Sequence, residues 1–237
     1  MRRRFAALIL WLFCSVCCVV AEKPTPIKLT DLPEPPSDIR ELIKAGLVTM
    51  EAGEREDSQT SQSSPKIIAE THYRIAYNYS TRSRWQVDSG NRRVVVTVRF
   101  RDIEWQPRHT IWFERKPATE GFWSDRLVLH EFDHVRVSTD PRVAERFEQL
   151  LRSRGSITKS LSSGDVVNRA FVDRLVEEHV SKVFSEISDL ISIRYKELDR
   201  VTSHGLHPLP EDSSLSELLR PRAPARTNSR SSRSGSE

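Results

Sequence analysis

Two histidines and a glutamate lie within five residues, in the stretch LVLHEFDHVRV from Leu127 to Val137. His130 and His134 are four residues apart, so on a helix both imidazoles leave the same face, about 5–6 Å apart at Cβ. Glu131 lies about 100° further round that helix. This is the H-E-x-x-H arrangement, which places two zinc ligands and a general base on one rigid element.

The chemistry predicted by this arrangement is hydrolysis of an amide bond. Zinc lowers the pKa of its water toward about 7 and polarises a carbonyl group. Glu131 would take the proton of that water and pass it to the leaving amine. The competing interpretation is a helix with two core histidines, because this spacing also arises by chance. The helical context and the strand expected just before the motif favour zinc, since such strands hold extended substrates by main-chain pairing.

The third zinc ligand is left open by the sequence, although a catalytic site needs three protein ligands and one open position. Asp140 stands at a possible ligand spacing, but it precedes a proline and is better explained as a helix N-cap. A glutamate about 20 residues after the motif is another known arrangement, and Arg154 stands there instead. Glu145 and Glu148 are nearer, and both fit the exposed face of an amphipathic helix.

His204 is the remaining candidate, in the sequence TSHG at the end of a long predicted helix. If that helix runs back antiparallel across the motif helix, its end could deliver His204 to the metal. A histidine that faces the helix dipole before a glycine stop explains the same residues. Spacing alone does not separate the two interpretations.

HEFDH, followed about 60 residues later by Tyr195 and TSHG, resembles a family of bacterial secreted zinc-dependent peptidases described as a domain of unknown function. That family pairs an H-E-x-x-H helix with a late Tyr-x-x-x-Thr-x-His-Gly-like element, and the resemblance covers about residues 68–206. The chain departs from the pattern in the wider spacing between Tyr195 and Thr202. The resemblance favours His204 as the third ligand of one Zn²⁺.

Tyr195 is a second candidate site residue. Its hydroxyl could donate a hydrogen bond to the oxyanion of the tetrahedral intermediate. The alternative is core packing, because Tyr195 continues the apolar stripe of the long helix. Thr202 is expected to hold the turn that carries His204, and Asp133 to orient a ligand imidazole.

The order of the predicted elements, a sheet followed by helices, indicates a zincin-like α+β fold that would position these residues. Residues 66–116 alternate apolar and polar side chains, with a hairpin turn at Gly90-Asn91, which predicts a small, mostly antiparallel sheet of three or four strands. Val128, Phe132 and Val135 would anchor the motif helix in the core. Three helices are expected: from Ser124 or Asp125 to about Ser138, from Pro141 to Gly155, and from near Gly164 to TSHG.

The two ends of the chain differ from its middle. Residues 1–21 combine MRRR, a 16-residue apolar run and VVA, which is typical of a secretory signal peptide cleaved after Ala21. The alternative is an uncleaved anchor, but the run is shorter than the roughly 18 residues that span a bilayer. We expect an extended or linker region with one short helix at 22–65, the metallopeptidase domain at 66–206 and a disordered Pro/Ser/Arg-rich tail at 207–237.

Charge and cysteine content restrict the partners. All three cysteines lie in residues 1–21, so a metal elsewhere must be held by His, Asp or Glu. Removing three N-terminal arginines and the +4 of residues 220–237 from the formal +4 leaves −3, so we expect no basic face for nucleic acid. The prediction is an exported (periplasmic or secreted) zinc peptidase acting on a peptide or protein, without stable membrane insertion after signal cleavage. The alternatives are an inactive zinc-binding envelope scaffold and a metal-free envelope protein.

Overall fold

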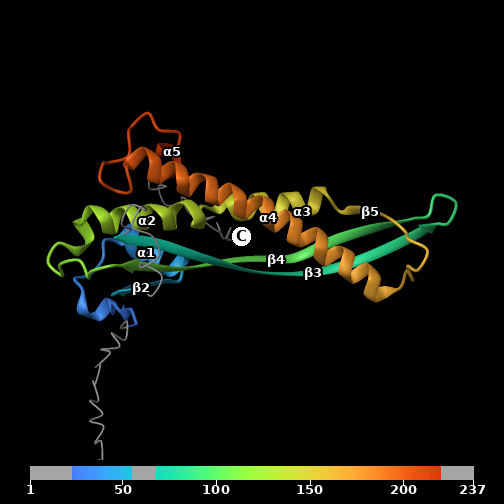
Figure 1. The fold of residues 1–237 in the computed structure, drawn as a ribbon, viewed down its shortest axis with the longest axis horizontal. Helices are drawn as coiled ribbons and strands as arrows, with labels where there is room; N and C mark the ends of the chain where they lie inside the picture. Colours follow the sequence, from blue (N-terminus) through green and yellow to red (C-terminus); the bar gives the residue numbers. More distant parts are fainter. Residues whose placement is uncertain (1–22, 55–67, 220–237) are drawn as a thin grey trace, which may run out of the picture.

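The computed structural model describes residues 23–54 and 68–219, which form an elongated α+β fold with a mixed sheet (Figure 1). In chain order the elements are β1 (Thr25–Pro26), η1 (Leu29–Asp31), α1 (Ser37–Ala45), β2 (Val48–Ala52), β3 (Ala69–Asp88), β4 (Arg93–Phe113), η3 (Phe122–Ser124), α2 (Arg126–Thr139), α3 (Pro141–Ser153), β5 (Ser156–Ser160), α4 (Arg169–Thr202) and α5 (Ser216–Leu219).

The sheet is built on a long antiparallel ribbon, β3 paired with β4, of 20 and 21 residues. The turn between them contains Gly90-Asn91, as predicted. The remaining strands lie along the other edge of β4. The last five residues of β4 pair with β2 in parallel, and its first five pair with β5 antiparallel. β1 extends the sheet beyond β2.

The three or four short strands expected in residues 66–116 are two long ones. Pro107 lies inside β4. It is tolerated because β4 residues 98–108 lie between the stretches paired with β5 and β2, and no strand of the described residues pairs with this edge there. A proline removes no ladder hydrogen bond at such a position.

A β-bulge at Asp102 changes which side chains of β4 face the helices. The pairing with β3 shifts register next to Ser80, and Asp102 has a φ of 49°. Before the bulge the even-numbered residues face the helices, as the burial of Phe100 shows, and after it the odd-numbered ones do, as for His109. One extra residue in one strand has this effect because successive side chains alternate between faces.

The helices cover one face of the sheet and enclose two main groups of buried apolar side chains. Along the ribbon, valines and Phe100 of β4 pack against α3 and α4. At the other end, Phe113 and Phe122 pack with the apolar face of α2. The predicted anchors Val128, Phe132 and Val135 are all fully buried there.

The predicted boundaries need correction at three places. The region expected to be extended at 22–65 contains the predicted short helix, α1, but also β1 and β2, which join the sheet. Between the second and third predicted helices, where no strand was predicted, residues 156–160 form strand β5. Leu215, in the segment predicted as tail, packs against Leu198 in a small apolar cluster. The predicted signal segment and residues 220–237 lie outside the described residues, as does most of the predicted linker at 51–65.

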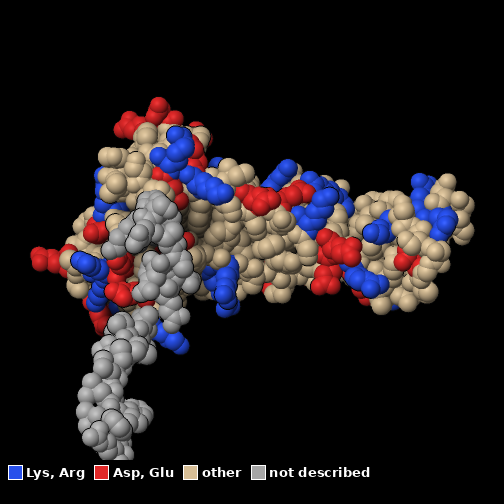
Figure 2. Space-filling model, viewed as in Figure 1, with Lys and Arg blue, Asp and Glu red and all other residues tan. Residues whose placement is uncertain are grey.

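Two global properties bear on partners. Among residues 23–54 and 68–219, no helix has the length and apolar character needed to cross a membrane. Figure 2 shows Lys and Arg interspersed with Asp and Glu over the face in view, so this view gives no region of a single charge.

Candidate metal centre

The motif helix α2 begins and ends as the sequence predicts. The Asp125 carboxylate caps it by accepting hydrogen bonds from the Leu127 and Val128 N–H groups, at 2.9 and 3.1 Å. This fixes the helix in register, so His130 and His134 leave the same face with their ring centroids 4.7 Å apart. Both imidazoles are buried, at 5% exposure each.

Asp199, near the end of α4, completes the group. Its Oδ1 lies 3.1 Å from His130 Nε2 and 3.0 Å from His134 Nε2. One ligand atom from each of the three residues falls within 4.8 Å of the others. Partial burial raises the pKa of the Asp199 carboxyl, but the hydrogen bonds from both histidines outweigh it and hold that pKa well below its usual range. Asp199 is therefore an anion between two imidazoles.

This donor set fits a zinc ion. Zinc binds histidine nitrogen at about 2.0–2.1 Å and carboxylate oxygen at about 2.0–2.2 Å, so tetrahedral ligands lie about 3.4 Å from each other. The separations of 3.0 and 3.1 Å from Asp199 Oδ1 to the two imidazoles are close to that length. Two imidazoles and one carboxylate also suit other divalent transition metals, so the donors alone do not select zinc.

TSHG does return to the motif helix, but the histidine is not the part that reaches the site. The His204 side chain is 78% exposed, and its Nδ1 lies 3.7 Å from Asp199 Oδ1. His204 lies after the helix end, in the left-handed region with a φ of 54°, which turns it outward. The position predicted for His204 beside the two histidines is thus taken by Asp199, five residues earlier.

The rest of TSHG holds His130 in place. Gly205 has a φ of 79° and lies so close to His130 that a Cβ there would stand 2.8 Å from the ring. As predicted, Thr202 holds this turn: its Oγ1 accepts from the Gly205 N–H at 3.2 Å and lies 3.4 Å from His130 Nδ1. The Leu206 carbonyl accepts from Arg126 on α2, which ties the turn to the start of the motif helix.

Glu131 is buried on the same helix, beside strand β3. Its Oε2 accepts a 2.6 Å hydrogen bond from the Thr71 hydroxyl, which also approaches the Glu131 carbonyl oxygen. Burial raises the pKa of the Glu131 carboxyl above its usual range, against the opposing effects of nearby His134 and the Thr71 bond. The Thr71 hydrogen bond therefore restrains the orientation of the Glu131 carboxylate.

Tyr195 packs its ring against His134, with centroids 4.4 Å apart, and directs its hydroxyl toward Ser138, 2.9 Å away. Ser138 Oγ lies 2.6 Å from His109 Nε2, and His109 Nδ1 lies 2.7 Å from the Gly46 carbonyl oxygen. Since that carbonyl only accepts, Nδ1 carries the proton and Nε2 is the acceptor. Burial raises the pKa of the Tyr195 hydroxyl far above its usual range. The oxyanion role of Tyr195 stays a prediction, since its hydroxyl is already bonded to Ser138.

The other candidates lie elsewhere. Asp140 is the N-cap of α3, as predicted, and accepts from the Arg142 N–H at 2.8 Å. Asp133 pairs with Arg136 at 2.6 Å and with neither histidine. Glu148 forms an ion pair with Arg152 one turn along α3, and Glu145 is exposed on the same helix. Arg154 pairs with Glu186.

No family model, curated protein or solved structure matches this chain. The resemblance to secreted zinc peptidases rests on HEFDH and TSHG alone and stays a prediction.

The sequence reasoning missed Asp199 and Thr71. A signal for Asp199 was present, because the apolar stripe of the long helix runs through Ile191 and Tyr195, and a further step of four residues reaches Asp199. An aspartate on the buried side of a helix needs a partner. Thr71 had no comparable signal, because an alternating strand contains several threonines and serines.

Proposed function

We propose that this chain is a zinc-dependent peptidase of zincin-like character, with His130, His134 and Asp199 as metal ligands and Glu131 as general base. One observation carries the proposal: two imidazoles of an H-E-x-x-H helix converge on one carboxylate oxygen, with the motif glutamate held beside them. Export to the periplasm or medium is part of the proposal and rests on the sequence of residues 1–21.

The chain's own groups have distinct tasks in this reaction. A zinc ion bound by the three ligands would supply Lewis acidity and lower the pKa of a water toward about 7. Thr71 holds Glu131 Oε2, which leaves Oε1 to accept the proton of the attacking water. As the C–N bond of the substrate breaks, Glu131 transfers that proton to the leaving nitrogen, and the water oxygen remains on the new carboxyl group.

A metal-binding scaffold without activity is the second candidate, and burial favours it. His130, Glu131 and His134 are 5%, 2% and 5% exposed, which is low for groups that a peptide must approach. A buried three-ligand site would join α2 to α4 and stabilise the fold, because metal affinity for the native state adds directly to stability.

Metal analysis of the purified protein is the first test. We expect about one zinc per chain, and loss of that zinc in His130→Ala. Iron at the same stoichiometry would contradict the peptidase proposal, because two histidines and one carboxylate also form the iron site of oxygenases. Absence of any bound metal would exclude both the peptidase and the scaffold.

Glu131→Gln then separates enzyme from scaffold. Hydrolysis of a peptide library should fall by roughly 10²- to 10⁴-fold, the usual contribution of a general base, while zinc content is unchanged. Zinc-loaded wild type without activity on the library would support the scaffold. Equal activity in wild type and Glu131→Gln would show that Glu131 is not the base.

A further inference from the structure

Four arginines form a cluster on the exposed face of the β3–β4 ribbon, the face without helices. This arginine cluster consists of Arg82 and Arg84 on β3 and Arg99 and Arg101 on β4, all exposed. They share a face because they alternate with side chains such as Phe100 that pack under the helices. Arg82 and Arg99 are direct cross-strand partners.

The arginine cluster has no explanation in folding. Within residues 23–54 and 68–219 no carboxylate forms an ion pair with any of its members, and the neighbouring acids are engaged elsewhere. Asp88 pairs with Arg93, and Asp102 accepts from the Ser80 hydroxyl at 2.6 Å. Like charges directly opposite each other destabilise an antiparallel pair. The Arg82–Arg99 pair therefore weakens the ribbon unless an anion lies against it.

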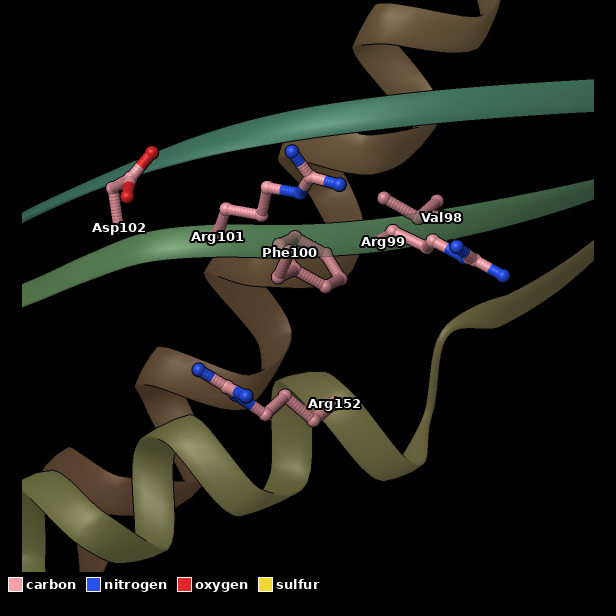
Figure 3. Close-up of a pocket in the computed structure, with 6 residues that line it drawn as sticks. All are labelled: Val98, Arg99, Phe100, Arg101, Asp102 and Arg152. Carbon is pink, nitrogen blue, oxygen red and sulfur yellow. The ribbon is translucent and has the colours of Figure 1, made fainter.

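A groove at the edge of the arginine cluster offers a recessed place for an anionic group. It has a volume of about 690 Å³ and is lined by β4 residues 98–102 and by Arg152 of α3 (Figure 3). Its opening coincides with the stretch of β4 that has no neighbouring strand. The Val98 N–H donates across this edge to Gly155, so by strand alternation the Phe100 N–H also points to this side. Arg99, Arg101 and Arg152 all line this groove, with Arg152 paired to Glu148 and the Arg99 and Arg101 side chains pointing in different directions along β4.

We propose that the arginine cluster docks on the phosphate groups of an anionic phospholipid surface. Guanidinium groups bind phosphate through two parallel hydrogen bonds, and rows of arginine on a strand face present them side by side. The arginine cluster lies about 35 Å along β3 from Thr71, so this contact is separate from the metal site.

The shape of the region argues against nucleic acid. A bare β-ribbon can enter the major groove of a duplex, but this ribbon has α3 and α4 packed on its other face. Binding of single strands uses aromatic side chains for base stacking. The neighbouring positions on the exposed face are Ser80, Gln86, Val95 and Thr97, none of which is aromatic. An extended array of phosphates remains the best fit.

Vesicle sedimentation tests this contact on the full chain. We expect binding to vesicles containing phosphatidylglycerol, weaker binding to pure phosphatidylcholine, and loss of the difference at about 1 M salt, where the screening length is about 3 Å. The double variant Arg82→Gln/Arg99→Gln should bind the anionic vesicles roughly 20- to 30-fold more weakly, at about fivefold per arginine. The matched control Lys182→Gln/Lys196→Gln removes the same charge from exposed positions on α4 and should change binding by less than about threefold.

A second variant separates lost contact from lost folding. Arg82→Glu places a carboxylate opposite Arg99, so the unfolding temperature should rise while vesicle binding falls. The apolar N-terminal run and the arginine-rich C-terminal tail are common to all variants and cancel in the comparison. Equal loss in the arginine and lysine variants, or no preference for anionic vesicles, would overturn the proposal. Tighter binding to duplex DNA than to the vesicles would replace it with a nucleic-acid surface.

Discussion

Charged side chains near the two ends of the β3–β4 ribbon differ in their burial and in whether they have a partner. At the end near α2, Glu131 and Asp199 are at least partly buried, and each is bonded to a neighbour at about 3 Å or less. At the far end, Arg82 and Arg99 are exposed, face each other and have no described carboxylate partner. The two carboxylates lie on α2 and α4, whereas the two arginines lie on the strands themselves.

This difference shows how burial selects for partners. A buried carboxylate without a hydrogen bond costs several kcal/mol, so the chain must provide a partner within the fold. An exposed arginine is solvated by water and can remain without one. The buried carboxylates are therefore determined by folding, and the exposed arginines stay available for an external anion.

The largest effect should come from Asp199→Ala. Loss of the only carboxylate in the described metal group should weaken zinc binding by more than about 100-fold, beyond the effect of losing an outer-shell partner. His204→Ala is the matched control, because that side chain is mostly exposed, and it should change affinity by less than about threefold. Competition titration with a chromogenic chelator measures both. The reverse order of effects would restore His204 as the third ligand.

Gly205→Ala should destabilise the near end by about 2–4 kcal/mol, because its Cβ would overlap the His130 ring and its φ is positive. Urea unfolding measures the change. Gly90→Ala, at the far end, is the control: its Cβ would meet only an Asp88 oxygen at 3.6 Å, so its cost should stay below about 1 kcal/mol. Similar losses of unfolding free energy at the two positions would show that Gly205 does not pack closely against the His130 ring.

His109→Gln should reduce stability by about 1–3 kcal/mol at neutral pH, because it disturbs two buried hydrogen bonds. Burial lowers the pKa of the His109 imidazole below that of the unfolded chain. The unfolded chain therefore binds more protons, and the contribution is fully present above about pH 6.5 and is lost as the pH falls. Urea unfolding from pH 7.5 to 5, with chelator present, should show a smaller slope in the variant. Equal slopes would mean that His109 is not held neutral.

The smallest effect should come from Arg74→Glu, which faces Arg108 across the ribbon. Replacing a like-charge pair by an opposite one should stabilise the protein by about 0.2–1 kcal/mol. The gain should diminish at high salt, since both side chains are exposed. A loss of stability in thermal unfolding at low salt would contradict the repulsion assigned to these paired arginines.

Near the metal site, the sequence predicted the ends of the individual helices better than the contact between α2 and α4. Asp125 and Asp140 cap their helices as expected, because capping depends on residues two or three positions away. The choice between Asp199 and His204 depends on how α4 is rotated against α2, which is set by packing along its whole length. Histidine was favoured as a zinc donor, and the continuing apolar stripe pointed to the aspartate instead.

The far end was missed for a different reason. A net charge of −3 outside the two ends predicted no basic face for nucleic acid, but net charge contains no information on the position of charged side chains. The alternation in RFR of β4 and in TRSR of β3 places arginines on one side whatever the total. Their cross-strand register continues unbroken from the turn at Gly90-Asn91, so the position of that turn places Arg82 opposite Arg99.

Helix α4 runs from the ribbon's far half to the metal ligands (Figure 1). Its 34 residues make a rod about 50 Å long. A rod of that length acts as a lever: a tilt of about 1° at its start displaces its end by roughly 0.9 Å. Metal coordination tolerates only about 0.2 Å in each bond length. An ion held by Asp199 would therefore restrain the end of α4 against α2, and would limit tilting of the helix about its distant half.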